Sequence, residues 1–113
     1  LGALIKKLGE PVESKEYRMK IMGEEDFRAY GQGVLKTFEQ RAEKAGIRIA
    51  KPSYEGVRLV FPNGWALLRM SLHDPQMPLN VESRKHGGVA EIVKEIEKLL
   101  EGFTSLDMSV FRN

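Results

Sequence analysis

From residue 16 onward, the spacing of apolar residues predicts two helices and five strands. Apolar residues recur at spacings of three and four within 27–45 and again within 89–100, which is typical of helices with one buried face. Apolar and charged residues alternate within 16–22, as they do in a half-buried strand. Short apolar runs predict the other strands at 47–50, 56–61, 65–70 and 79–83. The order strand, helix, four strands, helix indicates an α+β fold, with an antiparallel sheet covered on one face by two helices.

Three local signals add detail to this pattern. Asn63 and Gly64 lie between two predicted strands and predict a tight hairpin turn, because both residues tolerate positive φ. The acidic residues 24–26 precede the first predicted helix, where negative charge complements the helix dipole. Gly31 and Gly33 lie inside that helix, and each costs about 1 kcal/mol relative to alanine, so we expect a bend there.

The chain has the length of one domain. Its 113 residues suffice to bury one hydrophobic core. Residues 1–8 have the pattern of a short amphipathic helix that Gly-Glu-Pro ends, so we expect 1–13 to be an interdomain linker helix and hinge. The domain itself is expected at 14–102, and residues 103–113 form a tail with no predicted element.

Composition narrows the classes of function. The chain has no cysteine, which excludes disulfides and thiolate chemistry and favours a cytoplasmic location. Eighteen basic and sixteen acidic residues leave a formal charge of +2, which is too small to be a nucleic-acid signature. No apolar run is long enough to predict a membrane span, so we expect no membrane partner. The two histidines lie far apart in sequence, and we expect no metal site and no catalytic residue in this domain.

The segment 68–78 contains the candidate chemistry. A predicted strand leads Arg69, Ser71 and His73 into a loop with two prolines. A guanidinium group, a hydroxyl group and an imidazole are groups that bind phosphate oxygens, and proline lowers the entropy lost when a loop binds. The alternative is structural: Arg69 pairs with Asp74 and Ser71 caps a turn. On the residues alone, the structural alternative is favoured.

Sequence motifs in the second half of the chain favour the phosphate site. Arg69-Met70-Ser71, then Leu72-His73-Asp74-Pro75 and Asn80-Val81-Glu82-Ser83, resemble the C-terminal phosphate-binding loop of the α-D-phosphohexomutases, the phosphomannomutase/phosphoglucomutase family. That loop has the pattern R-x-S-N-T-x-P and is followed by V-E-A or V-E-S. Tyr54–Arg58 is similar to the family's D-G-V/L-x-V strand, and Gly64–Arg69 is similar to its G-W-x-L-V-R segment.

The resemblance covers residues 11–100 and implies both a fold and a function. It implies a TATA-binding-protein-like β-α-β4-α domain, which is the fourth and last domain of the enzyme. The whole enzyme would interconvert hexose 6-phosphate and hexose 1-phosphate by intramolecular phosphotransfer, and the isolated domain would be inactive. Mg²⁺ and a hexose 1,6-bisphosphate activator are implied for the whole enzyme and not for this domain. The implied partners are a phosphosugar and the other domains of the same polypeptide.

Position by position, the resemblance implies a set of phosphate ligands. Arg69, Ser71 and His73 would bind the substrate phosphate through side chains, and Leu72 and Asp74 through backbone N–H groups. Leu72 and His73 depart from the family's usual Asn (or Gly) and Thr, which removes two hydrogen-bonding side chains and adds one imidazole.

Two other functions stay open. The altered loop is compatible with a catalytically inactive interaction domain. Basic residues on predicted strands, Arg18, Lys20, Arg58 and Arg69, are compatible with nucleic-acid binding on the sheet, although the aromatic RNA-binding motif is missing, which makes this the weaker hypothesis.

Overall fold

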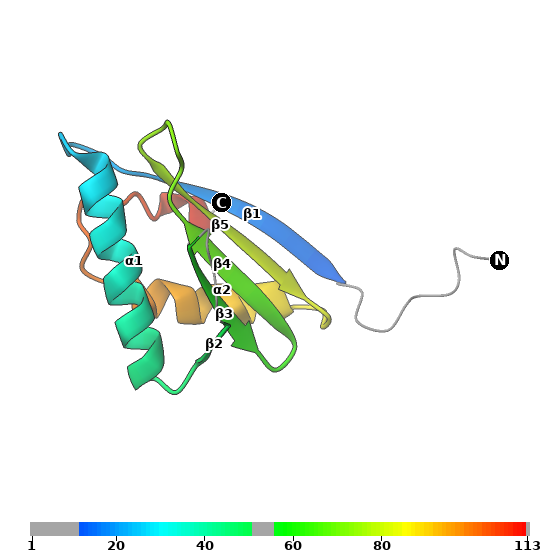
Figure 1. Cartoon of the computed structure of the whole chain (residues 1–113). Helices are drawn as coiled ribbons and strands as arrows, with labels where there is room; N and C mark the ends of the chain where they lie inside the picture. Colours follow the sequence, from blue (N-terminus) through cyan, green and yellow to red (C-terminus); the bar gives the residue numbers. More distant parts are fainter. Residues whose placement is uncertain (1–11, 51–55, 113) are drawn as a thin grey trace.

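A five-stranded antiparallel sheet forms the centre of the structure, which is a computed structural model that describes residues 12–50 and 56–112 (Figure 1). The strand order is β1-β5-β4-β3-β2, and every neighbouring pair is antiparallel. The predicted β-α-β4-α fold is confirmed. A short 3₁₀ helix, η2, follows near the C-terminus. The elements are β1 (Glu13–Lys20), α1 (Phe27–Lys44), β2 (Arg48–Ala50), β3 (Gly56–Phe61), β4 (Gly64–Arg69), β5 (Gln76–Ser83), α2 (Gly88–Leu99) and η2 (Ser109–Arg112).

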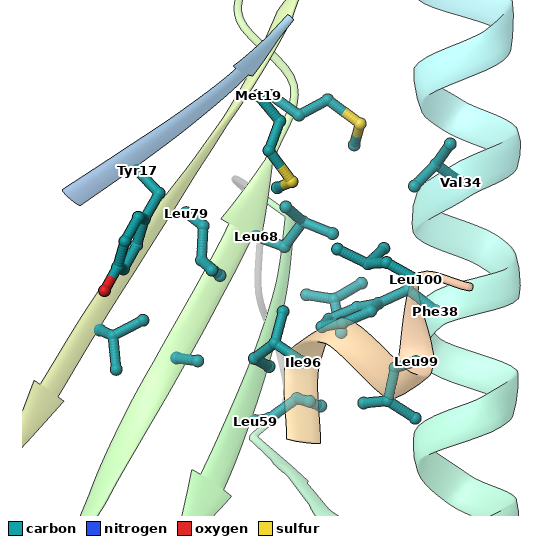
Figure 2. Close-up of a cluster of buried hydrophobic side chains, with 14 of the residues drawn as sticks. Tyr17, Met19, Val34, Phe38, Leu59, Leu68, Leu79, Ile96, Leu99 and Leu100 are labelled. Atoms are coloured by element: carbon teal, nitrogen blue, oxygen red, sulfur yellow. The ribbon is translucent and has the colours of Figure 1, made fainter. Parts of the chain in front are cut away.

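The hydrophobic core lies between one face of the sheet and the two helices. Phe38 of α1, Ile96 of α2 and the sheet residues Leu59 and Leu68 are each 0% exposed. Figure 2 shows Phe38 and Ile96 pointing from the two helices toward the sheet. Burying a side chain of this size stabilises the fold by about 1.5–3 kcal/mol. Apolar residues are spaced three and four apart in the helices and two apart in the strands. This spacing gives each element one apolar face, and these faces pack together here.

The opposite face of the sheet is covered by neither α1 nor α2, and we call it the open face. Side chains alternate between the two faces along a strand, so the neighbours of core residues point to the open face. Its described members are Ser14, Glu16, Arg18, Lys20, Arg48, Ala50, Arg58, Val60, Trp65, Leu67, Arg69, Gln76, Pro78, Asn80 and Glu82.

The hairpin between β3 and β4 exists, but its turn differs from the prediction. Phe61 pairs with Gly64, so Pro62 and Asn63 make the turn and Gly64 begins β4. None of the described residues other than glycine has positive φ, and Gly64 does not either, so the predicted positive-φ turn was wrong. Gly64 is needed for space instead, because a Cβ atom there would collide with the backbone of Glu82 on β5.

One of the two glycines of α1, Gly31, also acts through packing. The helix continues through Gly31 and Gly33 without a break. Gly31 is buried, and a Cβ atom there would overlap the sulfur of Met70, whereas Gly33 is exposed and has no atom within 4 Å of that position. Among the acidic residues before the helix, Asp26 is the N-cap, and its side chain accepts a hydrogen bond from the Ala29 N–H at 3.0 Å.

Two segments flank the predicted domain, the linker at 1–13 and the tail at 103–113. The predicted linker helix lies outside the described residues, and β1 begins at Glu13. The described part of the tail packs on the domain: Leu106 is buried and forms a β-bridge with Ile21, and the rings of Phe111 and Tyr17 are 4.9 Å apart. The tail therefore contributes to the core.

Candidate functional site

Residues 70–75 form the β4–β5 loop, which contains most of the predicted site. The Ser71 N–H donates to the Gln76 carbonyl at 3.1 Å, and the Gln76 N–H donates to the Asp74 carbonyl at 2.8 Å. The Asp74 N–H lies 3.4 Å from the Ser71 hydroxyl oxygen, which accepts from it. These bonds hold the loop as a closed turn, and they include the Ser71 cap that the structural alternative predicted.

A groove with a volume of about 690 Å³ separates this loop from α1. We call it the α1–loop groove. Apolar Leu35, Val57 and Met70 lie among polar and charged groups from α1 and from the loop. Its lining residues are Arg28, Gln32, Leu35, Lys36, Glu39, Gly56, Val57, Met70, Ser71, Leu72 and His73.

Arg28 fixes the loop to the helix across this groove. Its Nη2 atom donates to the Leu72 carbonyl oxygen at 2.6 Å. The guanidinium group has five N–H donors, so this bond leaves others for a ligand. On the helix, Arg28, Gln32 and Lys36 are four residues apart and share one face. Arg28 and Lys36 place two positive charges beside one negative charge, that of Glu39, so the groove favours an anion.

Arg69 points away from the groove. It lies between Leu68, which is in the core, and Met70, which packs against the core, so its side chain is on the open face. The side chain is 35% exposed, and its Nη2 atom is 4.0 Å from Oε2 of Glu16 on β1. An ion pair this long and this exposed contributes about 0–1 kcal/mol.

Among the described residues, the acidic partner of Arg69 is therefore Glu16, whereas the structural alternative named Asp74. Glu16 also accepts from Arg18 Nε at 3.0 Å and from Asn80 Nδ2 at 3.4 Å. The hydrogen bond from Arg18 is the main cause that lowers the pKa of Glu16, and the charge of Arg69 adds a smaller effect in the same direction. The Asp74 carboxylate accepts instead from Gln76 Nε2, at 3.4 Å.

The structure thus brings together only some of the predicted ligands. Ser71, Leu72 and His73 line the α1–loop groove, whereas Arg69 and Asp74 do not. Arg28 and Lys36 were not among the predicted ligands. Their spacing on one helix face is visible in the sequence, but only the tertiary structure shows that this face meets the loop.

Two further kinds of feature are absent from the described residues. Across 12–50 and 56–112, no group of three His, Asp or Glu side chains is arranged to hold a metal ion. Within the same ranges, no helix has both the length and the apolar character needed to cross a membrane.

The fold is similar to part of a known enzyme structure. The chain matches no protein-family model and no curated protein. It is similar to the crystal structure of a phosphoglucomutase/phosphomannomutase family protein from Burkholderia thailandensis, with a TM-score of 0.62 and 19% sequence identity. The match covers 86% of this chain and 19% of that protein. At this identity the likeness shows the fold alone, and the chain spans about a fifth of that protein's length.

Proposed function

We propose that this chain is a phosphosugar-binding domain of a phosphohexomutase, and that the phosphate group of a hexose phosphate binds in the α1–loop groove. The observation that carries the proposal is the joint lining of this groove by Ser71, Leu72 and His73 with the cations Arg28 and Lys36. The similarity in fold to a domain-sized part of a phosphoglucomutase/phosphomannomutase family protein supports the choice of enzyme class.

The groove supplies donors for a phosphate dianion. Ser71 offers a hydroxyl group and Lys36 offers an ammonium group. Arg28 offers those of its N–H groups that do not bond to the Leu72 carbonyl oxygen. His73 adds two N–H donors when its imidazole is protonated. A hydrogen bond to a charged group contributes about 1.5–3 kcal/mol, so two or three of them at the low end of this range give about 3–4.5 kcal/mol, a dissociation constant on the order of millimolar.

Such weak binding fits a domain that acts together with others. In the whole enzyme, we assign to this domain the holding of the substrate phosphate and the exclusion of water during phosphoryl transfer. We assign the transfer chemistry, with its Mg²⁺ and hexose bisphosphate, to the other domains. The isolated chain should therefore bind a hexose phosphate and show no mutase activity.

Arg69 is the second candidate anchor for the phosphate. The family resemblance assigns it to the phosphate, but its guanidinium lies on the open face, on the other side of the sheet from Ser71 and His73. Its weak pair with Glu16 leaves it available to an anion that approaches the loop from that side. Mutating the two arginines separately tells which side of the loop binds the phosphate.

The test is an NMR titration of the full chain with glucose 6-phosphate, glucose 1-phosphate and mannose 6-phosphate. We expect amide shifts in residues 70–76 and in the first half of α1, and none with unphosphorylated glucose. Arg28→Ala should weaken binding by about tenfold, which corresponds to the loss of one charged hydrogen bond. Lys94→Ala, a matched loss of one exposed charge on α2, should bind as the wild type does.

Two results would overturn parts of this assignment. No shift at millimolar hexose phosphate would refute phosphosugar binding by the isolated domain. Loss of binding in Arg69→Ala, together with unchanged binding in Arg28→Ala, would move the phosphate from the groove to the open-face side of the loop.

A further inference from the structure

The open face carries more positive than negative charge. Its described strand residues include five basic side chains against two acidic ones, a net of three positive charges. One acidic residue, Glu16, is already engaged by Arg18 and lies near Arg69. The basic residues are Arg18, Lys20, Arg48, Arg58 and Arg69, and the acidic ones are Glu16 and Glu82.

An apolar centre lies among these charges. Leu67 of β4 and Pro78 of β5 are buried, although no described helix covers this side of the sheet. Trp65 is half-buried beside them, and the guanidinium carbon of Arg58 lies 4.6 Å from the centre of its ring. Tryptophan and arginine around an apolar centre are the residues that most often dominate protein–protein binding energies.

We infer that the open face is a docking surface for an acidic protein segment, one with carboxylates placed around an apolar side chain. The carboxylates would pair with the peripheral arginines, and the apolar side chain would contact the exposed part of Trp65. Opposite charge on the partner sets both the rate and the specificity of such an encounter. This inference does not depend on phosphate binding in the α1–loop groove.

Other occupants fit the face less well. A second copy of this chain would bring two positive faces together. The N-terminal residues 1–11 contain two lysines and one glutamate, so they have the same sign of charge as the face. Single-stranded nucleic acid is bound by several free aromatic rings on which bases stack. Trp65 is the one aromatic residue on the open face within the described strands, so this face offers bases only a single ring on which to stack.

Trp65 makes the test specific to this face, because it is the only tryptophan of the chain. The probes are a short peptide of glutamate and leucine, the same peptide with lysine in place of glutamate, and a single-stranded thymidylate oligonucleotide. With the acidic peptide, we expect a saturable change in Trp65 fluorescence and NMR shifts on β3 and β4. The lysine peptide and the oligonucleotide should bind at least about tenfold more weakly.

Charge-reversal variants locate the binding. Arg58→Glu should weaken the binding of the acidic peptide by about tenfold, and Arg58→Lys should keep most of the affinity for this peptide. Lys94→Glu on α2, with the same change of charge, should bind normally. If Arg58→Glu does not fold, Arg48→Glu tests the same prediction at an exposed position of the edge strand β2.

Three outcomes would overturn the inference: tighter binding of the oligonucleotide than of the peptide, no peptide binding at millimolar concentration, or peptide shifts confined to the α1–loop groove. The hexose phosphate titration is read at residues 70–76 and Arg28. Failure of one assignment is therefore distinguishable from failure of the other.

Discussion

Replacing Gly31 and Gly33 by alanine, one at a time, separates helix propensity from packing in α1. The two positions are in the same helix and two residues apart. A methyl group at Gly33 has no atom within 4 Å. At Gly31 the same methyl group would overlap the sulfur of Met70 and lie 3.3 Å from its Cγ atom, at the root of the β4–β5 loop.

The expected magnitudes follow from these surroundings. Alanine is better than glycine inside a helix by about 1 kcal/mol, so Gly33→Ala should stabilise the fold by about that amount. This corresponds to a rise of about 4 °C in the melting temperature for a chain of this size. Gly31→Ala gains the same propensity but must displace Met70, and overpacking costs about 1–3 kcal/mol. The cost and the gain together leave a net destabilisation between about 0 and 2 kcal/mol, and because Met70 is flexible we expect the low end, near about 0 kcal/mol.

Thermal and urea unfolding, followed by circular dichroism, give the two free-energy changes. A double-mutant cycle supplies the control: in a Met70→Ala background, Gly31→Ala should stabilise as much as Gly33→Ala does. Amide NMR shifts at Ser71 and His73 should move in Gly31→Ala and not in Gly33→Ala. The packing explanation is wrong if, in the chain that keeps Met70, Gly31→Ala stabilises the fold as much as Gly33→Ala does.

Two further predictions concern the ends of α2. Hydrogen bonds from the backbone N–H groups of Gly87 and Val89, both 3.0 Å long, lower the pKa of Glu13 below its ordinary value of 4.5. Glu13 therefore stabilises the fold fully above that value and loses the contribution as the pH falls through the lowered pKa. Urea unfolding should show Glu13→Gln to be less stable than wild type at neutral pH, with the difference vanishing in acid; a pH-independent difference would contradict this. Arg41 of α1 donates to two carbonyl oxygens at the end of α2, at 2.9 and 2.8 Å, and lies over the ring of Phe103. Arg41→Met should cost about 1–3 kcal/mol in urea unfolding, and a loss no larger than that of Lys94→Met would refute this role.

Much of the fold was predictable because the apolar spacing agrees with the burial that the core requires. The strand expected at 56–61 is β3, and the helix expected at 89–100 differs from α2 by one residue at each end. The turn after β3 was mispredicted because strand register, and not the preference of Asn63 and Gly64 for positive φ, determines which residues form it. The strand β5 begins three residues before the expected start at 79, because pairing with β1 extends it to Gln76.

The candidate site was only partly predictable. The segment around Ser71 and His73 was identified from residue types and family resemblance, and both residues line the groove. Arg28 lies more than forty residues earlier in the chain, and only the docking of α1 on the sheet brings it to the Leu72 carbonyl. Sequence spacing within one element gives no information about such a contact between two elements.

Strand alternation explains why the predicted ligands are divided between two surfaces. Arg69 is the last residue of β4, so it still obeys the alternation that directs Leu68 to the core, while the loop residues after Met70 are free of it. The sheet therefore lies between the guanidinium of Arg69 and the groove that Ser71 and His73 line. A small anion suits the groove, which offers hydroxyl, imidazole and guanidinium groups beside a closed turn, whereas the open face has an apolar centre and spread charges that suit a larger partner. Because the two surfaces share no lining residue, single substitutions on one should leave binding at the other intact, and a domain of this size can carry both.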